Sequence, residues 1–345
     1  MDGHSVSASF EGFEQLDVME DASSGLKAII AIDQTKLGPA LGGCRMWTYA
    51  SEEAAISDAL RLARGMTYKS ALADIPYGGG KAVIIGNPAT DKSSKLFRSL
   101  GRFIERLNGR YITGMDLGTT PGDMDEIAKE TGYVTDVTGS LGATGNFTAE
   151  MTAYGVYIAI RTSLKQKYGS EQLQQRTVAV QGLGKVGYAL CRYLHQAGAR
   201  LIVADLHDGL VKQAAAQFGA TAVSVYSIHK QSCDIFSPCA LGGILNDVTL
   251  PELKCPIIAG AANNQLANAK HDAALQQAGI LYAPDYAINA GGIIVTAAEL
   301  DGSSASYARS QVERISDRLA HIYALSSTLP PAAAADAITR KLLAK

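Results

Sequence analysis

Val178–Gly187, with the sequence VAVQGLGKVG, is the stretch that decides how the second half of this chain folds. An apolar, β-branched run leads into a G-x-G-x-x-G pattern, and the following residues have the spacing of an amphipathic helix. In dinucleotide-binding folds the first glycine makes the strand-to-helix turn, the second admits a pyrophosphate and the third allows close helix–strand packing. The motif alone is weak evidence, but its strand–turn–helix context is the required one. We therefore predict cofactor contacts from Gly182, Gly184, Lys185, Val186 and Gly187.

The next predicted strand ends in an acidic residue, Asp205. A carboxylate at this place accepts hydrogen bonds from the ribose diol of NAD and repels the 2′-phosphate of NADP. Leu206 and His207 follow, so no arginine stands there to bind that phosphate. The sequence therefore favours NAD as the cofactor. The alternative is an ordinary surface acid that follows a glycine turn.

Short apolar segments alternate with helical patterns from residue 176 onward, which is typical of a doubly wound parallel sheet. The strands are predicted at 177–181, 201–205, 222–225, 235–237, 257–260 and 281–283. In the first half, strands are predicted at 26–32, 81–85 and 111–113, and helices at 51–64 and 97–107. A long helix from 152 to 167 would connect two domains, and the tail is helical at 305–324 and 331–345.

We therefore predict an α/β protein of two domains with a cleft between them. Residues 1–145 would form an α/β domain for substrate binding and oligomerisation. Residues 146–310 would form a Rossmann-type NAD-binding domain with a doubly wound parallel sheet. Residues 311–345 would be helices that pack back towards the first domain.

Length and composition limit the classes of function. A chain of 345 residues can form two domains, each with its own core. Its net charge is −2 and no basic stripe is present, so we expect neither nucleic acid nor an anionic membrane as a partner. With no signal peptide and no apolar run long enough to cross a bilayer, we expect a cytoplasmic protein. Five cysteines without C-x-x-C spacing indicate buried thiols and no metal site.

The segment Leu72–Lys81, LADIPYGGGK, is the candidate catalytic segment. Its three glycines lack Cβ atoms, so a small substrate would lie directly against the peptide groups. Desolvation, together with the charge of Lys69, would favour the neutral amine of Lys81 and make it a base. Most glycine clusters are structural, so this pattern alone is weak evidence. Asp116, after a predicted strand, would supply a carboxylate for proton transfer.

Motifs from Phe10 to Leu300 resemble, in the right order, the Glu/Leu/Phe/Val dehydrogenases. They are GPALGGCRM (38–46), GMTYK (65–69), GGGK (78–81), YITGMD (111–116), GAANNQL (260–266) and PDYAINAGG (284–292). The resemblance implies NAD-dependent oxidative deamination: an L-amino acid, NAD⁺ and water give a 2-oxo acid, ammonium and NADH, and the reverse reaction is reductive amination. It also implies a homo-oligomer, either a dimer or an octamer.

The resemblance implies roles for single residues as well. Lys69 would hold the substrate α-carboxylate, Lys81 would activate water against the iminium intermediate, and Asp116 would exchange protons with the amino group. Further substrate contacts would come from Gly42, Gly43, Met66 and Asn289. Further cofactor contacts would come from Thr152, Cys239, Ala240, Ala261, Asn263 and Asn289. The two asparagines could instead be turn-capping side chains.

The family's side-chain pocket maps to Leu41, Gly114, Ile293 and Thr296. Leu41 stands where glutamate-specific relatives have a lysine, so a glutamate side chain would be left unpaired. Gly114 stands where leucine-specific relatives have alanine, and loss of the methyl group would deepen the pocket. The hydroxyl of Thr296 would meet an indole N–H or bond its own helix. These features favour an aromatic substrate, phenylalanine or tryptophan, with the branched-chain amino acids leucine and valine as the alternative.

One segment, GNFTAEMT at 145–152, departs from the family pattern because it has no proline. Proline stiffens such a loop, so its absence predicts a looser hinge or an altered wall beside the cofactor. Two further hypotheses remain open: a biosynthetic enzyme that makes an aromatic 2-oxo acid, and a catalytically silent sensor of NAD or amino acid. Retention of Lys69, Lys81 and Asp116 argues against the silent sensor.

Overall fold

The computed structural model describes residues 4–8 and 12–344, and the chain divides into two compact units. Unit 1 comprises Met1–Gly145, Thr296–Ser304 and Leu342–Lys345, and unit 2 comprises Asn146–Val295 and Ala305–Lys341. Each unit is built around its own sheet. The division falls within two helices, α9 (Gly291–Leu300) and α12 (Pro331–Leu343), which therefore contribute residues to both units.

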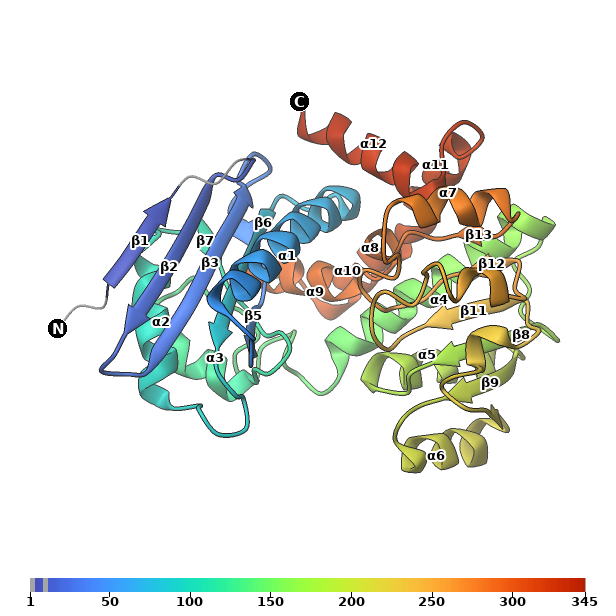
Figure 1. The fold of residues 1–345 in the computed structure, drawn as a ribbon, viewed down its shortest axis with the longest axis horizontal. Helices are drawn as coiled ribbons and strands as arrows, with labels where there is room; N and C mark the ends of the chain where they lie inside the picture. Colours follow the sequence, from blue (N-terminus) through green and yellow to red (C-terminus); the bar gives the residue numbers. More distant parts are fainter. Residues whose placement is uncertain (1–3, 9–11, 345) are drawn as a thin grey trace. The chain divides into compact units, whose positions relative to one another are not determined.

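A mixed sheet forms the centre of unit 1 (Figure 1). Its strand order is β1-β2-β3-β6-β4-β7, with β5 also paired to β6. The strands are β1 (His4–Ala8), β2 (Gln15–Asp21), β3 (Leu26–Gln34), β4 (Ala40–Leu41), β5 (Cys44–Trp47), β6 (Gly78–Ile85) and β7 (Tyr111–Ile112). The strands from β1 to β6 along this order pair antiparallel, whereas β4, β5 and β7 run parallel to their neighbours. The strands predicted at 26–32, 81–85 and 111–113 are thus confirmed.

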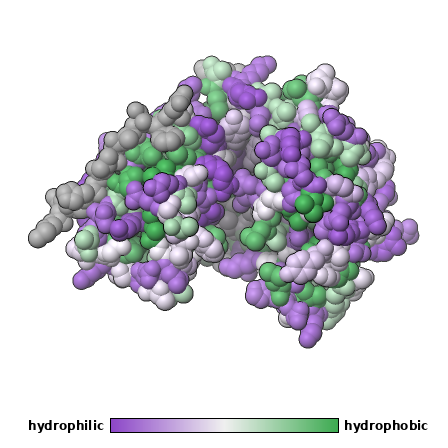
Figure 2. Space-filling model, viewed as in Figure 1, coloured by the Kyte–Doolittle hydropathy of each residue, from purple (hydrophilic) through white to green (hydrophobic). Residues whose placement is uncertain are grey.

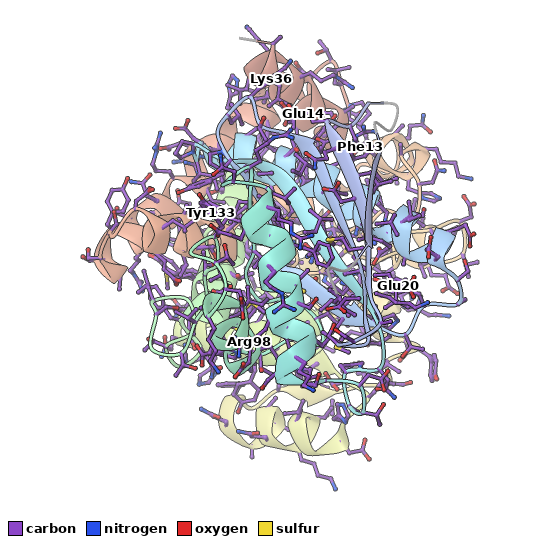
Figure 3. The ribbon with its side chains drawn as sticks, turned by 90° about the vertical axis from the view of Figure 1, so that its left-hand side faces the viewer. Phe13, Glu14, Glu20, Lys36, Arg98 and Tyr133 are labelled. Atoms are coloured by element: carbon purple, nitrogen blue, oxygen red, sulfur yellow. The ribbon has the colours of Figure 1, made fainter. Side chains whose placement is uncertain are left out.

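Helices cover both faces of this sheet. They are α1 (Glu52–Ala73), α2 (Ser94–Arg106) and α3 (Pro121–Ala128). Alternate residues of β3 and β6 face opposite sides, so Ile29 and Val83 pack with α1, while Ile30 and Ile84 pack with α2. In Figure 3, which looks onto the α2 side, the helix that carries Arg98 lies in front of the strands. The α1 face of the sheet is the one that also carries residue 81.

Local sequence signals account for where α1 begins but not for where it ends. The Ser51 hydroxyl accepts a hydrogen bond from the backbone N–H of Ala54 at 3.2 Å, and acidic residues occupy the first turn, as expected of a helix N-terminus. The helix continues through Gly65, beyond the predicted end at residue 64. It ends at Asp74, whose φ of 54° is left-handed. The extension carries residues 66 and 69 on the same helix.

Unit 2 contains a parallel sheet of order β10-β9-β8-β11-β12-β13 (Figure 1). Its strands are β8 (Thr177–Gln181), β9 (Arg200–Ala204), β10 (Thr221–Ala222), β11 (Ile235–Pro238), β12 (Ile257–Ile258) and β13 (Leu281–Tyr282). The strands predicted from residue 176 onward are confirmed apart from the one at 222–225, where β10 ends at Ala222. The chain moves outward from β8 to β10 and then returns to the other side of β8 with β11. This reversal is the topological switch point at which doubly wound sheets bind ligands.

The helices of unit 2 connect these strands or follow them. They are α4 (Phe147–Tyr168), α5 (Lys185–Gln196), α6 (Asp208–Phe218), α7 (Lys270–Gln277), α8 (Asp285–Ile288), α10 (Ala305–Glu313), α11 (Ile315–Leu325) and the short 3₁₀ turns η1 (Ile228–Lys230) and η2 (Leu250–Glu252). Together with the parallel sheet, they confirm the predicted Rossmann-type α/β class.

The proline-free segment 145–152 does not form the expected loop. Asn146 is the N-cap residue of α4, and the helix begins at Phe147, well before the predicted start at residue 152. The physical reason is that proline lacks a backbone N–H and clashes with the preceding turn, so a segment without it can extend the helix. The prediction of a looser hinge made of these residues is therefore wrong for Phe147 to Thr152.

No helix in the described part of the chain is long and apolar enough to cross a membrane. In the view of Figure 2, hydrophilic residues cover much of the visible face of unit 2, and apolar residues form small separate patches between them. Exposed apolar side chains such as Leu206, Tyr226 and Leu241 are dispersed along the sequence. Isolated apolar residues of this kind are normal on a folded protein and do not mark a binding surface.

Candidate active site and nucleotide-binding site

An ion pair between a buried lysine and a half-buried aspartate joins the two predicted catalytic residues. Lys81, in β6, is 4% exposed, and its Nζ lies 2.7 Å from Oδ2 of Asp116. The parallel pairing of β4 with both β6 and β7 brings Asp116, which follows β7, close to Lys81. Burial acts to raise the pKa of Asp116, but the charges of Lys81 and Arg45 outweigh it and hold that pKa well below the usual range. Asp116 is therefore a carboxylate across the whole neutral range.

Arg45 belongs to this cluster, although the sequence analysis did not single it out. Its Nε donates to Asp116 Oδ2 at 3.0 Å, and its Nη1 donates to Asp58 Oδ2 at 3.0 Å. The Tyr49 hydroxyl donates to the same Asp58 oxygen at 2.7 Å. An arginine within the strand sequence CRMW was the available signal, because a buried arginine needs acidic partners. Arg45 and Asp58 also line a cavity of about 410 Å³ beside this network.

Two glycines allow the strands to approach this cluster closely. A Cβ on Gly42 would lie 1.8 Å from the Gly80 carbonyl oxygen and 3.4 Å from Met66 Cγ. A Cβ on Gly43 would lie 2.4 Å from the Met115 carbonyl oxygen and 3.0 Å from Asp116 Cβ. The structure therefore places Gly42 against β6 and Met66, and Gly43 against the segment that carries Asp116.

Met66 and Lys69 are the predicted substrate residues on α1. Their spacing of three residues places them on one face of the helix, about one turn apart. Both side chains are half-buried. Because Met66 approaches Gly42 and α1 covers the face of β6 that carries Lys81, the structure brings Gly42, Met66 and Lys81 into one region of unit 1.

The glycines that precede Lys81 do not form an open surface for substrate. They are buried within β6, and the positions that Cβ atoms would take are filled by the protein itself. A Cβ on Gly79 would lie 2.2 Å from the backbone nitrogen of Thr67 in α1, and one on Gly80 would lie 2.7 Å from the Tyr111 ring. The expectation that substrate lies against these peptide groups is therefore wrong. The glycines instead let α1 and Tyr111 pack onto β6, which determines where Lys81 lies.

The argument for a deepened pocket at Gly114 is also wrong. A Cβ on Gly114 would lie 2.5 Å from Asp136 Oδ2 and 2.6 Å from Thr135 Oγ1. Side chains of this protein therefore occupy the space that a missing methyl group was expected to free. Leu41, in β4, is 2% exposed, and it stands in the same sheet as β7, which Gly114 follows.

The other two pocket residues, Ile293 and Thr296, lie on α9. Their spacing of three residues places them on the same face of that helix. Ile293 is buried and Thr296 is half-buried.

The glycine-rich turn lies at the carboxyl end of β8, where the strand order reverses. Gly182 has a φ of 95°, and a Cβ there would lie 2.8 Å from Ala240 Cβ. A Cβ on Gly187 would lie 2.0 Å from the Gly182 carbonyl oxygen. By contrast, among the described residues no atom lies within 4 Å of the Cβ position of Gly184, the N-cap residue of α5. These features match the turn, packing and open-approach roles of the three motif glycines.

The first turn of α5, which begins with Lys185 and Val186, presents backbone N–H groups at a helix N-terminus. No side chain of the described residues caps this end of α5. A helix N-terminus carries partial positive charge and unpaired N–H groups, so it binds phosphate. The open space at Gly184 and this helix end together fit the pyrophosphate of a dinucleotide.

Asp205 is tied to the glycine-rich turn. Its Oδ2 accepts a hydrogen bond from the backbone N–H of Leu183 at 2.6 Å, and its Oδ1 accepts one from the N–H of His207 at 2.8 Å. Each carboxylate oxygen can accept a second hydrogen bond. The carboxylate is therefore held at the end of β9 with capacity left for a ribose diol.

Residues after β11 lie beside the same turn. The backbone N–H of Cys239 donates to the Gln181 carbonyl oxygen at 2.7 Å, and Ala240 approaches Gly182. The predicted cofactor residues Cys239 and Ala240 are thus brought to the switch point between β8 and β11.

Thr152, another predicted cofactor residue, lies on α4, and its hydroxyl donates to the Thr148 carbonyl oxygen at 2.9 Å.

Ala261, Asn263 and Asn289 form a second cluster in unit 2. Asn289 Nδ2 donates to the Ala261 carbonyl oxygen at 3.1 Å and to Asn263 Oδ1 at 2.8 Å. Asn289 is 5% exposed, and its Oδ1 has no hydrogen-bond partner among the described residues. A buried amide oxygen without a partner is costly, which suits an oxygen that receives an N–H from a ligand.

Comparison with known proteins agrees with this arrangement. The model "Glu/Leu/Phe/Val dehydrogenase, dimerisation domain" matches residues 14–133, and "Glutamate/Leucine/Phenylalanine/Valine dehydrogenase" matches residues 142–215 and 207–335. Leucine dehydrogenase from Geobacillus stearothermophilus is 52% identical over 326 residues, which cover 94% of this chain and 89% of that protein. L-tryptophan dehydrogenase from Nostoc punctiforme is 48% identical over 313 residues, which cover 90% of this chain and 87% of that protein.

Among solved structures, that of L-tryptophan dehydrogenase from Nostoc punctiforme is similar with a TM-score of 0.83 and 44% sequence identity, and the match covers 96% of each chain. The matched models and relatives span both units described above. They confirm the resemblance that the sequence motifs indicated. The chain therefore belongs to the Glu/Leu/Phe/Val dehydrogenase family and is an amino-acid dehydrogenase, an oxidoreductase that acts on CH–NH₂ groups.

Proposed function

We propose that the protein is an NAD-dependent dehydrogenase of branched-chain L-amino acids, leucine or valine. The similarity to leucine dehydrogenase, at 52% identity, exceeds the 48% to tryptophan dehydrogenase. The filled space beside Gly114 removes the main structural argument for an aromatic side chain. Both observations support the branched-chain alternative over the aromatic preference that the sequence analysis favoured. The single observation that carries the reaction itself is the ion pair between the buried Lys81 and Asp116.

The reaction requires a neutral amino group on the substrate, because Cα cannot release a hydride while its nitrogen is an ammonium. Lys69 binds the substrate α-carboxylate as a point charge. Asp116 is already ionised, so it can receive the ammonium proton, and the later step uses Lys81 as the neutral amine. Deamination releases a proton to solvent overall, so alkaline conditions favour it. NAD⁺, when bound, accepts the hydride from Cα.

Lys81 then takes a proton from water as the water oxygen bonds to the iminium carbon. Asp116 returns its proton to the nitrogen and is a carboxylate again. As the C–N bond breaks and ammonia leaves, Asp116 takes the proton of the hydroxyl group, the carbonyl forms, and that proton passes to the departing ammonia to give ammonium. The buried position of Lys81 holds its amine beside Asp116. Arg45 donates to the Asp116 carboxylate and is itself held by Asp58, so it keeps the carboxylate in place.

The cofactor proposal depends on the carboxyl edge of the sheet in unit 2. The open approach at Gly184 and the N-terminus of α5 fit a pyrophosphate, and Asp205 fits a ribose diol that lacks a 2′-phosphate. Cys239, Ala240 and Thr152 would line the cofactor. Asn263 and Asn289 would contact the nicotinamide end, and the Asn289 Oδ1 atom offers an acceptor there.

We also propose that the enzyme is a cytoplasmic homo-oligomer, either a dimer or an octamer. The model that matches residues 14–133 is described as a dimerisation domain, which supports self-association through unit 1. All five cysteines are free thiols, which fits a reducing compartment. The sensor hypothesis is weakened by the intact Lys81–Asp116–Arg45 cluster.

Initial rates of NADH formation with purified protein and NAD⁺, in alkaline buffer, test the proposal. The panel comprises leucine, valine, phenylalanine, tryptophan and glutamate, and NADP⁺ replaces NAD⁺ in a parallel series. We expect kcat/KM to be highest for leucine or valine with NAD⁺. Higher values for phenylalanine or tryptophan would reinstate the aromatic alternative. NADH binding without turnover on any amino acid would support a silent sensor.

A further inference from the structure

Asp136 is a buried carboxylate in a slot formed by two glycines. A Cβ on Gly114 would lie 2.5 Å from Asp136 Oδ2, and a Cβ on Gly142 would lie 2.2 Å from Asp136 Oδ1. Any other residue at either position would therefore collide with this carboxylate. Two glycines on opposite sides of one side chain indicate that the local structure is built around the Asp136 carboxylate.

Hydrogen bonds to two other segments hold the Asp136 carboxylate and its loop, which runs from Asp136 to Gly142. Asp136 Oδ2 accepts a hydrogen bond from the backbone N–H of Met115 at 2.8 Å, directly before Asp116. Glu299, from α9, accepts from the Asp136 N–H at 2.9 Å and from the Gly142 N–H at 2.7 Å. These bonds join the Asp136 loop to the catalytic segment and to the helix that carries Thr296.

Asp136 is held in this position at an energetic cost. Its φ of 60° lies in the left-handed region that glycine favours, and the residue is only 6% exposed. Burial and the charge of Glu299 raise the pKa of Asp136 to about 6, although the Met115 hydrogen bond opposes this shift. Strained backbone and a buried acid are features that persist where the surrounding structure holds them for a function.

The surroundings of the Asp136 carboxylate indicate that it fills space and does not bind a ligand. Asp136 Oδ1 is enclosed and has no hydrogen-bond partner among the described residues. It lies against Gly142, so a ligand could not reach it without displacing the loop. Oδ2 is already bonded to Met115. The carboxylate therefore fills volume beside Gly114 and is enclosed by the protein around it.

We propose that Asp136 determines the length of the substrate side chain. This inference rests on the proposed function and on the side-chain pocket that the family resemblance implies, of which Leu41, Gly114 and Thr296 belong to unit 1. The Asp136 carboxylate fills the space beyond Gly114, closes the pocket there, and leaves room for leucine or valine but not for an aromatic ring. Substrate size is then set by Gly114 and Asp136 together, with Glu299 as the residue that positions the Asp136 loop.

Two variants test this role. Asp136→Gly suits the left-handed backbone and opens the space between Gly114 and Gly142. We expect it to raise the kcat/KM of phenylalanine relative to leucine by about ten-fold or more, the scale on which one or two methylene groups discriminate in an apolar pocket. Asp136→Asn keeps the volume and removes the charge, so we expect it to retain the wild-type substrate ratio. KM for NAD⁺ should be unchanged in both.

The outcomes separate the inference from the proposed function. If the wild type prefers leucine and Asp136→Gly folds but keeps the wild-type ratio, the length-setting role is overturned while the function stands. If Asp136→Asn shifts the ratio as strongly as Asp136→Gly, charge and not volume is responsible, and the inference is again overturned. A wild type that prefers phenylalanine, or turns over no amino acid, refutes the proposed function before any variant is needed and the inference with it.

Discussion

Arg45 donates a 3.0 Å hydrogen bond from Nε to Asp116 Oδ2, the oxygen that Lys81 also contacts. Two cations on one carboxylate oxygen explain why the pKa of Asp116 is held low in spite of its burial. Asp58 holds Arg45 from the other side, so the arginine links an acid on α1 to the catalytic acid after β7. Arg45 is therefore a positioning residue for the proposed proton transfer.

Arg45→Gln should raise the pKa of Asp116, because it removes a positive neighbour that stabilises the carboxylate. We expect the acidic limb of the kcat/KM profile to move to higher pH and kcat to fall by about ten-fold or more. KM for NAD⁺ should not change. Arg61→Gln is the matched control, because Arg61 contacts the other oxygen of Asp58 but is half exposed and does not reach Asp116. Equal effects of the two variants would contradict a specific role for Arg45.

Lys81→Ala should lower kcat by a factor of about 10² to 10⁴, the usual contribution of a general base, while the Kd for NADH stays near that of the wild type. Steady-state rates and NADH fluorescence titration measure the two effects separately. Lys27→Ala, at an exposed ion pair with Glu20, provides the control. A comparable loss of NADH affinity would show that Lys81 supports the fold or the cofactor and not the water-activation step.

Asp205→Ala should relax the discrimination against NADP⁺, because the variant loses the carboxylate that repels a 2′-phosphate. We expect the ratio of kcat/KM for NADP⁺ over NAD⁺ to rise by about ten-fold, which corresponds to about 1.4 kcal/mol. Asp208→Ala removes an exposed acid in the first turn of α6 and serves as the control. An unchanged cofactor ratio for Asp205→Ala would rule out the ribose contact.

The raised pKa of Asp136 predicts a pH-dependent stability. The pKa of Asp136 is about 6 in the folded protein, against an ordinary value of 3.8. The folded protein therefore holds the proton more tightly than the unfolded chain, and the protonated carboxyl favours folding. This contribution to the free energy of unfolding is lost as the pH rises from about 4 through 6. The loss is at most about 3 kcal/mol, from about two pKa units. Asp136→Asn cannot ionise, so its Tm relative to wild type should be higher at pH 8 than at pH 4. A constant difference in Tm would contradict the raised pKa.

Gly79→Ala should destabilise unit 1, because its Cβ would lie 2.2 Å from the Thr67 backbone nitrogen and neither β6 nor α1 can move freely. We expect a loss of about 1–3 kcal/mol or more, typical of overpacking in a core. Gly65→Ala is the control: it lies on α1 with nothing within 4 Å of its Cβ among the described residues, and alanine favours helix. Thermal unfolding of both variants measures the contrast, and a tolerated Gly79→Ala would refute the packing role.

Much of the fold was predictable from the sequence because its signals are local. The alternation of apolar runs with helical spacing identified the parallel strands of unit 2, and the G-x-G-x-x-G pattern identified its nucleotide turn. The Ser51 cap likewise marked the start of α1. The end of α1 and the start of α4 were misplaced, since Gly65 was tolerated within one helix and a proline-free segment extended the other.

The candidate site was predictable in part. Lys81 and Asp116 were identified by motif, and the structure places them in contact. Arg45 was not singled out, because its importance comes from Asp58 and Asp116, which are distant in the sequence and meet it only when β5 pairs beside β6.

The sequence by itself determined the order of strands and helices, the glycine turn, and the presence of a lysine and an aspartate for proton transfer, because each depends on residues that are neighbours in the chain. Only the tertiary structure decided what fills the space beside each glycine. Gly80 faces the Tyr111 ring and Gly114 faces Asp136, so at both glycines the protein itself fills the space where a Cβ would lie. The physical reason is that the space beside a glycine is filled by residues that are distant in the sequence and meet it only in the folded protein. Local sequence patterns do not contain that information.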